Sequence, residues 1–580
     1  MSVYLSRLLI IFTLILASHV SFAKETRYPD FNNGRFVQPL VVAKHYMVSS
    51  ANPYASEAGM RILAKGGSAI DAAIAVQMVL TLVEPESSGI GGGAFSLYWD
   101  NKNKKLSSYD GREKAPLSVD AKLFQENGNN MNWWEALAGG RAVGTPGVIA
   151  MMEKVHKRYG KLPWAALFVD AIRLSEQGFE ISPTLAASIK DKTNPALGRY
   201  NFAWHYFFPN GKPIAAGVMK KNPQLAMTFK RLAFLGASGF YKGQIAMDIV
   251  KAVRGAKDNP GLMTLKDLAQ YESIERPPVC ASYKAYKICG MGPPTSGGMT
   301  VIQILKLLEQ KDLAQYKPLS VEAVHLFTQA TRLAYADRAK YMADADFVAV
   351  PVEGLIDADY LTKRSLLLNA NRDMDKATAG NPPNADQNWL TSISPEQPST
   401  THFSIIDQQG NGFSMTSSIE MAFGSTLMVG GFLLNNQLTD FSFSDEKNGE
   451  KIANRVQAGK RPRSSMSPFM VFDKDNNLVL VIGSPGGSRI INYVAKTLLA
   501  VLEWNMDIQA AIDLPHYVNR NGGTDLEKNT SAMVLKKALE DKGHTVTVRD
   551  LNSGLHGIMV TKDGLQGGAD PRRVGHVLGK

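Results

Sequence analysis

Two adjacent threonines, Thr400 and Thr401, follow the polar segment 381–398 and begin an alternating run of residues. A threonine hydroxyl is a poor nucleophile unless a base lies beside it, and the α-amino group of the same threonine is such a base once the chain is cut before it. The pattern therefore predicts an inactive precursor that is cleaved between Ser399 and Thr400, and a mature N-terminal threonine that acts as nucleophile. The alternative is that the pair reflects only the β-propensity of threonine.

The residues that follow predict a β-hairpin. Apolar and polar residues alternate from Phe403, Asn411-Gly412 is a strong turn signal, and a second alternating strand covers residues 413–420. One face of this hairpin is apolar, and the other carries hydroxyl groups and ends in Glu420. The hydroxyl face either lines a polar pocket around Thr400 or faces solvent.

Two further features of the sequence suggest chemistry that we do not assign to them. His402 shares a strand face with Thr400, which suggests a Thr–His pair, but the α-amine already supplies the base. We therefore interpret His402 as structural. The run Gly89–Gly93 lacks the spacing and the lysine of a phosphate-binding loop, so we expect it to let backbone segments pack closely near the pocket.

A glycine-rich turn lies further along the chain. Residues 478–482 predict an apolar strand, Gly486 and Gly487 lie in a tight turn, and a helical period runs from Ile490 to about Trp504. Backbone N–H groups at such a strand-to-helix turn can stabilise a developing oxyanion. The alternative is that the glycines are needed only for close packing.

Several segments, in the same order along the chain, resemble the γ-glutamyltranspeptidase family. They are Gly66-Gly67, Asp71-Ala72-Ala73, Gly89–Gly93, Asp110-Gly111-Arg112-Glu113, Gly144–Gly147, Pro293–Gly298, the Thr400 block and Ala569–Arg572. The resemblance implies an autoprocessed N-terminal-nucleophile hydrolase of the α/β class (α+β type). It also implies a large subunit, residues 24–399, and a small subunit, residues 400–580, that form a heterodimer folded as one four-layer αββα sandwich.

The same resemblance assigns the reaction and its machinery. It implies cleavage of the γ-glutamyl amide of glutathione and related compounds, with transfer of the glutamyl group to water or to an amino acid or peptide. Thr400 matches the nucleophile, and Ser418 matches the hydroxyl residue that hydrogen-bonds it and assists self-cleavage. Gly486 and Gly487 match the oxyanion hole. No metal or organic cofactor is expected.

The glutamyl head group is a zwitterion, and the resemblance assigns residues to both of its ends. Arg112, Ser464 and Ser465 match the residues that hold the α-carboxylate, while Gln437 and Asp440 match those that hold the α-amino group. Arginine offers bidentate geometry to a carboxylate. We expect the positive and the negative group to lie on opposite sides of one pocket and so to fix the orientation of the substrate.

The chain departs from the family pattern in two places. Glu420 replaces an asparagine two residues after Ser418, and a carboxylate there can also accept from an ammonium group. The segment between Asp440 and Ser464 is short and charged and lacks the aromatic and proline residues of a lid loop. A reduced lid would open the site to water and to bulky acceptors. The alternatives are an acylase acting on glutaryl or poly-γ-glutamate amides, and a degenerate family member that only binds.

The first 23 residues have the pattern of a secretory signal peptide. Arg7 precedes an apolar run, residues 8–17, and Ser21-Phe22-Ala23 is a small-residue cleavage site. An uncleaved anchor is the alternative reading. No later stretch approaches about 20 apolar residues, so we expect no stable membrane span. Together with the resemblance, these features predict a periplasmic protein.

Composition excludes other classes of function. The formal net charge is +11, but the basic residues are dispersed and no nucleic-acid-binding module accompanies them, so we expect no nucleic-acid partner. The two cysteines, Cys280 and Cys289, flank a short predicted hairpin and show no zinc-ligand spacing. They form either a disulfide in an oxidising compartment or two free buried thiols.

Overall fold

The computed structural model describes residues 28, 31–32, 34–392 and 399–580. The predicted signal peptide and the last residues of the predicted linker, 393–398, lie outside this part of the chain. The described residues form a mixed fold of helices and sheets, as predicted.

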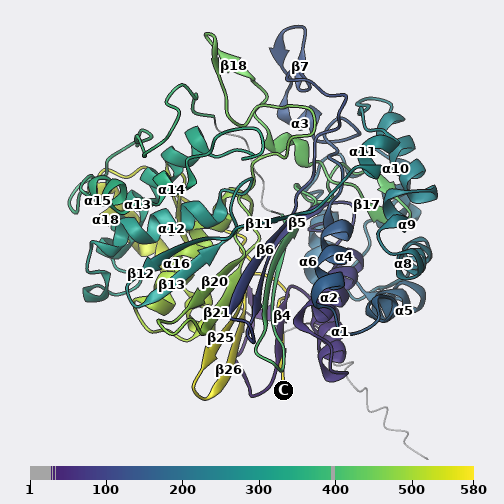
Figure 1. The fold of residues 1–580 in the computed structure, drawn as a ribbon, viewed down its shortest axis with the longest axis horizontal. Helices are drawn as coiled ribbons and strands as arrows, with labels where there is room; N and C mark the ends of the chain where they lie inside the picture. The colour runs from purple at the N-terminus through teal and green to yellow at the C-terminus, as the bar shows by residue number, and fades with distance from the viewer. Residues whose placement is uncertain (1–27, 29–30, 33, 393–398) are drawn as a thin grey trace, which may run out of the picture.

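Two seven-stranded antiparallel sheets form the centre of the molecule (Figure 1). The first contains, in spatial order, β11 (Ile274–Arg276), β6 (Lys105–Gly111), β5 (Gly93–Asp100), β15 (Gly412–Ser418), β14 (Thr401–Ile406), β4 (Met47–Ser50) and β27 (His576–Gly579). The second contains β12 (Val279–Tyr283), β13 (Tyr286–Gly290), β20 (Phe469–Phe472), β21 (Leu478–Gly483), β25 (His556–Thr561), β26 (Gly564–Ala569) and β3 (Val41–Ala43). Each sheet takes strands from both sides of the Ser399–Thr400 bond.

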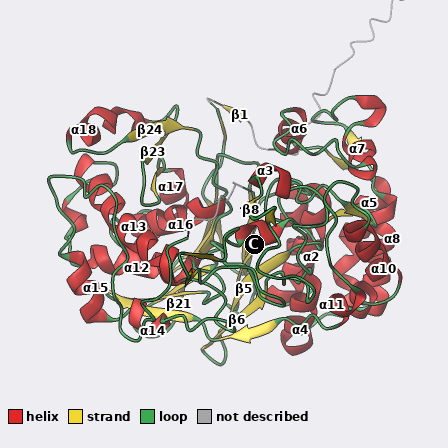
Figure 2. Ribbon diagram, turned by 90° about the horizontal axis from the view of Figure 1, so that it is seen from above, coloured by secondary structure: helices red, strands yellow, loops and turns green. Residues whose placement is uncertain are grey.

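Helices cover the outer face of each sheet, and Figure 2 shows them gathered on the two sides of the strands. The first sheet contacts α1 (Pro53–Ala64), α2 (Ala69–Val83) and α4 (Val148–Tyr159). The second contacts α12 (Gly297–Glu309), α16 (Ile490–Leu502) and α17 (Ile508–Asp513). Further helices are α3 (Trp133–Ala136), α5 (Val169–Gln177), α6 (Pro183–Lys190), α7 (Asn201–Phe207), α8 (Pro223–Leu235), α9 (Ser238–Tyr241), α10 (Gln244–Arg254), α11 (Leu265–Ala269), α13 (Val321–Tyr341), α14 (Val352–Leu355), α15 (Ala358–Ser365) and α18 (Lys536–Asp541).

Short sheets and 3₁₀ turns complete the described fold. The small strands are β1 (Phe31–Asn32), β2 (Arg35–Phe36), β7 (Gln125–Glu126), β8 (Asn129–Asn130), β9 (Phe179–Glu180), β10 (Met219–Lys220), β16 (Met428–Val429), β17 (Phe432–Leu433), β18 (Glu446–Lys447), β19 (Glu450–Lys451), β22 (Tyr517–Asn519), β23 (Thr524–Glu527) and β24 (Val546–Arg549).

The helices begin where local capping chemistry predicts. Asn52 accepts a hydrogen bond from the Tyr54 N–H at the start of α1, and Ser68 forms a capping box with Asp71 at the start of α2. Every residue of α2 is buried, so this helix lies inside the apolar core rather than on the surface. The helix predicted after the glycine-rich turn is confirmed as α16.

The hairpin predicted after Thr400 is confirmed as β14 and β15. Its apolar face, which includes Phe403 and Met415, belongs to the same hydrophobic cluster as α1 and α2. The register pairs Thr401 with Ser417. The second strand ends at Ser418, earlier than predicted, because Glu420 adopts a left-handed conformation with φ 75° that a strand cannot continue.

The hydroxyl face of the hairpin is buried against the second sheet. The Ser404 hydroxyl donates to the His556 carbonyl at 3.0 Å, and the Ser414 hydroxyl donates to the Ile482 carbonyl at 3.1 Å. His402 hydrogen-bonds Thr416 at 2.9 Å, and burial holds its pKa well below the usual range. This face therefore joins the two sheets and does not face solvent.

The two cysteines lie opposite each other in neighbouring strands. Cys280 of β12 pairs in register with Cys289 of β13, and the two form a disulfide. Of the two states predicted for them, the structure contains the disulfide.

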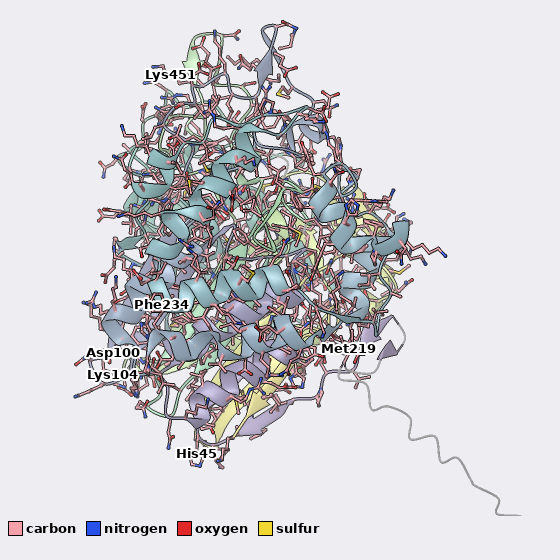
Figure 3. The ribbon with its side chains drawn as sticks, turned by 90° about the vertical axis from the view of Figure 1, so that its right-hand side faces the viewer. His45, Asp100, Lys104, Met219, Phe234 and Lys451 are labelled. Carbon is pink, nitrogen blue, oxygen red and sulfur yellow. A yellow bond between two sulfur atoms is a disulfide. The ribbon has the colours of Figure 1, made fainter. Side chains whose placement is uncertain are left out.

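The segment between Asp440 and Ser464 includes the hairpin β18–β19, whose four strand residues are exposed. In Figure 3, Lys451 of this hairpin lies at the opposite end of the molecule from His45. Among the residues that the structure describes, no helix is both long and apolar enough to cross a membrane.

An apolar cluster between the sheets holds them together away from the site. Trp99 of β5 is 1% exposed and packs on Phe472 of β20 with ring centroids 4.6 Å apart. We predict that Trp99→Ala lowers the free energy of unfolding by about 3–5 kcal/mol, because it leaves a cavity between the sheets. Urea unfolding midpoints measure this loss.

The control is Trp134→Ala, since Trp134 is 52% exposed. A surface substitution of this kind changes stability by about 0.5 kcal/mol or less. Equal midpoints for the two variants would contradict the assignment of Trp99 to the inter-sheet core.

Candidate active site

Thr400 immediately precedes β14, and both its side-chain hydroxyl and its backbone carbonyl make hydrogen bonds. Its hydroxyl lies 2.9 Å from the Ser418 hydroxyl, and the Arg573 guanidinium donates to its carbonyl at 3.2 Å. Thr400 has φ 87°, which is a strained value for a β-branched residue. The strain is located at the bond where cleavage is predicted.

The glycine-rich turn contacts the carbonyl group of the Ser399–Thr400 peptide bond. The Gly486 N–H donates to the Ser399 carbonyl at 3.1 Å. Gly486 has φ 134°, and a Cβ there would lie 2.7 Å from the Tyr493 ring, so this position requires glycine. Gly487 begins the 3₁₀ turn η5 (Gly487–Arg489), which leads into α16. This is the strand–turn–helix arrangement predicted for an oxyanion site.

A continuous chain of hydrogen bonds runs from the nucleophile into the predicted head-group residues. The Glu420 N–H donates to the Ser418 Oγ at 2.9 Å. The Gln437 side-chain amide then bridges two carboxylates, donating to Glu420 at 3.0 Å and to Asp440 at 2.8 Å. The left-handed turn at Glu420 brings its side chain back toward η4 (Gln437–Asp440), which carries the other two groups.

Arg112 completes this chain at the end of β6. Its guanidinium donates to the Asp440 carboxylate at 2.5 Å, and both side chains are almost fully buried. The prediction that these two groups lie on opposite sides of a pocket is therefore wrong for this structure. Opposite charges buried in one place are costly unless they pair, so direct contact is the stable arrangement.

The serine loop is held against the same arginine. Arg112 donates to the carbonyls of Pro462 and Arg463, the two residues directly before Ser464. The Ser464 Oγ accepts from the Met466 N–H at 3.1 Å, and the Ser465 Oγ accepts from Arg338 at 2.6 Å. Backbone hydrogen bonds from this loop to residues 294 and 296 fix its position.

Close backbone contacts around the site require Gly91, Gly92 and Gly93 of the run Gly89–Gly93. A Cβ on Gly92 would lie 2.1 Å from the Ser418 carbonyl oxygen, and one on Gly93 would lie 2.4 Å from the Glu113 carboxylate. The prediction that these glycines allow close packing near the pocket is confirmed.

Sequence reasoning did not assign roles to several charged residues in contact with the site. Glu113 lies 3.6 Å from Arg112, and burial raises its pKa to about 8 despite that positive neighbour. Glu84 and Glu86 are buried near Arg573, and burial raises the pKa of Glu86 to about 7. A signal existed for Glu113, which ends the Asp-Gly-Arg-Glu block, and for Arg573, which follows the Asp-Pro-Arg block.

The arrangement can perform acyl transfer at a carbonyl group. A hydroxyl nucleophile, an N–H group on a neighbouring carbonyl, and buried groups of both charges lie within one hydrogen-bonded network. Such a network can bind a zwitterion, because an arginine attracts a carboxylate and paired carboxylates attract an ammonium group.

Comparisons with known proteins show which family this chain resembles. The family model for gamma-glutamyltranspeptidase matches residues 55–580. A glutathione hydrolase proenzyme of Bacillus subtilis (strain 168) is 38% identical over 579 residues, 98% of this chain and 96% of that protein. A cephalosporin acylase from Bacillus halodurans matches with a TM-score of 0.83 at 26% identity, over 96% of this chain and 98% of that chain. A Helicobacter pylori gamma-glutamyltranspeptidase matches with a TM-score of 0.54 at 38% identity, over 56% of this chain and 92% of that chain.

The raised pKa of Glu113 predicts how stability depends on pH. The folded state keeps the Glu113 proton up to about pH 8, whereas the unfolded chain, in which the carboxyl has its ordinary pKa of 4.5, releases it near that pH. The stability from this group is therefore complete below pH 4.5 and is lost as pH rises to about 8. We predict that Glu113→Gln, which cannot ionise, gains stability relative to the parent protein by up to about 1.4 kcal/mol per pH unit in this window.

Urea unfolding of both proteins between pH 5 and 8 measures this difference. Glu126→Gln, at an exposed carboxylate, controls for the loss of one negative charge. If the two stability curves for Glu113→Gln and the parent run parallel, Glu113 is ionised in the folded protein and the assignment fails.

Proposed function

Because this chain belongs to the gamma-glutamyltranspeptidase family, we propose that it is an enzyme that cleaves the γ-glutamyl amide of glutathione and related compounds. It passes the glutamyl group to water or to the amine of an amino acid or peptide. The observation that carries this proposal is the unbroken network from Thr400 through Ser418, Glu420, Gln437 and Asp440 to Arg112.

The first reaction is cleavage of the enzyme's own chain. Thr400 Oγ attacks the carbonyl carbon of Ser399, the peptide C–N bond breaks, and an ester links Ser399 to the threonine side chain. The Gly486 N–H already donates to that carbonyl oxygen and stabilises the charge that develops on it. Water then hydrolyses the ester, which frees the Ser399 carboxylate and the Thr400 α-amine.

The second reaction acts on the substrate with the same groups. The Thr400 α-amine takes the hydroxyl proton as Oγ attacks the γ-amide carbonyl, and Gly486 and Gly487 stabilise the oxyanion. The departing amine takes a proton and leaves a glutamyl ester on Thr400. Water or an acceptor amine then attacks this ester and regenerates the free hydroxyl.

The head group of the substrate binds at the far end of the network. We assign its α-carboxylate to Arg112, Ser464 and Ser465. We assign its α-ammonium to Asp440 and Glu420, which Gln437 holds together. Since Arg112 and Asp440 contact each other in this structure, the zwitterion binds to a preformed ion pair, and each end meets its opposite charge.

Processing accounts for the organisation of the chain. We propose that residues 1–23 are removed as a signal peptide, that residues 24–399 and 400–580 are the large and small subunits, and that the enzyme is periplasmic. Because each central sheet takes strands from both sides of the cut, the subunits stay interleaved as a heterodimer. Two packed sheets with helices on their outer faces support a four-layer αββα sandwich.

An acylase is the second candidate, favoured by the match to the cephalosporin acylase, and we take a glutaryl-type amide as its test substrate. Glutaryl and γ-glutamyl groups differ by the α-amino group. The buried carboxylates of Glu420 and Asp440, joined by Gln437, favour the γ-glutamyl substrate. A glutaryl ligand has no ammonium group to interact with them. A binding protein without activity would show no release from either compound.

We predict that the enzyme releases aniline from a γ-glutamyl anilide at least about tenfold faster, in kcat/KM, than from the glutaryl anilide. Glu420→Gln removes one of the two carboxylates and should lower this ratio by about threefold to tenfold. Steady-state release from both compounds measures the ratio.

Glu450→Gln, at an exposed carboxylate of the β18–β19 hairpin, is the matched control and should leave the ratio unchanged. Faster release from the glutaryl anilide would replace the proposed function with the acylase function.

A further inference from the structure

A large cavity lies beside the catalytic loops, within the part of the chain that the structure describes. Its volume is about 940 Å³. Its walls come from helix α13, from the segments 376–379 and 391–392, and from the loop between β22 and β23. None of the groups assigned above to the glutamyl head group lines it.

The walls of this cavity, which we call the basic chamber, carry an excess of positive charge. The positively charged side chains that line it are Arg338, Lys376, Arg489, Arg520 and Arg549. Asp525 is the acidic residue among the lining side chains, and it pairs with Arg489 at 3.3 Å and with Arg549 at 2.9 Å. A chamber with this balance attracts an anion, and arginines favour a carboxylate or another planar oxyanion.

The basic chamber shares its walls with both loops of the candidate active site. Ser488, which follows the oxyanion glycine Gly487, lines the chamber and accepts a hydrogen bond from Arg520 at 2.7 Å. Tyr335 of α13, which also lines the chamber, donates to the Ser488 carbonyl. Arg338 lines the chamber and also donates to Ser465 at 2.6 Å. The chamber therefore begins where the oxyanion turn ends.

We propose that the basic chamber binds the carboxylate of the peptide on the far side of the scissile amide. This inference rests on the proposed function. The glutamyl head group binds at Arg112 and Asp440, and the amide carbonyl at Gly486 and Gly487. Because the chamber borders Ser488 directly after the oxyanion turn, a peptide attached to that amide reaches the arginines of the chamber if it continues past the turn. The carboxylate bound there belongs either to the leaving peptide or to an acceptor peptide.

The test compares donors that differ only in this carboxylate. The donors are γ-glutamylcysteinylglycine and its C-terminal amide. The parent enzyme should favour the free carboxylate by about threefold to tenfold in kcat/KM, the gain expected for a partly exposed charge-assisted contact. Arg549→Gln and Arg520→Gln should each reduce this preference, and the double variant should abolish it, while release from the amide donor stays the same.

Arg173→Gln is the matched control. Arg173 is 42% exposed and pairs with Asp170 at 3.0 Å, whereas Arg549 is 45% exposed and pairs with Asp525 at 2.9 Å. The control should keep the full preference. Arg520 contacts Ser488 beside the oxyanion turn, so Arg520→Gln could unfold the protein. In that case the result for Arg549→Gln decides the test.

A second arm identifies the source of the carboxylate. Transfer from γ-glutamyl anilide to glycylglycine is compared with transfer to glycylglycine amide. If the preference for the free carboxylate depends on Arg549 only in this arm, the chamber binds the acceptor. If it depends on Arg549 only in the first arm, the chamber binds the leaving peptide. Either result supports the proposal. Equal use of acid and amide in both arms overturns it, as does an equal loss for both donors in the variants. No release from any γ-glutamyl donor would overturn the proposed function as well.

Discussion

The register of β14 against β15 is the constraint on which the site depends. Pairing of Thr401 with Ser417 sets Thr400 beside Ser418, and their hydroxyls meet at 2.9 Å. A slip of one residue would move every side chain of these strands to the opposite face. That slip is opposed on both faces, because the apolar face packs on the buried helices and the hydroxyl face bonds to the second sheet. Packing of the core against both faces of the hairpin therefore fixes the position of the Thr400 hydroxyl.

The charges of the site are stable inside the protein because they are paired. Arg112 contacts Asp440, and the carboxylates of Asp440 and Glu420 share the amide of Gln437. A buried pair contributes little to net stability, but removing one partner leaves a costly unpaired charge. We therefore interpret the network as a device for orientation. In the proposed function, these opposite charges at fixed positions let a zwitterionic substrate bind in one direction.

Much of this arrangement could be predicted from the sequence. The alternation around Thr400 predicted the hairpin, the glycine-rich turn predicted a strand–turn–helix, and the family resemblance identified the remaining residues that the fold brings together. Contacts between distant segments could not be predicted. Nothing local to Arg112 indicates that it pairs with Asp440, nothing local to Arg573 indicates that it holds the Thr400 carbonyl, and the charge of the basic chamber arises only when α13 and the loop after β22 meet. The left-handed backbone at Thr400 was also missed, because threonine rarely adopts it.

We propose above all that the chain cuts itself before Thr400 and uses the freed threonine as its nucleophile. The most direct measurement is the intact mass of the purified, incubated protein, with N-terminal sequencing of each component. We expect two fragments, the smaller of which begins at Thr400. A single folded chain that still contains the Ser399–Thr400 bond after incubation would contradict the proposal.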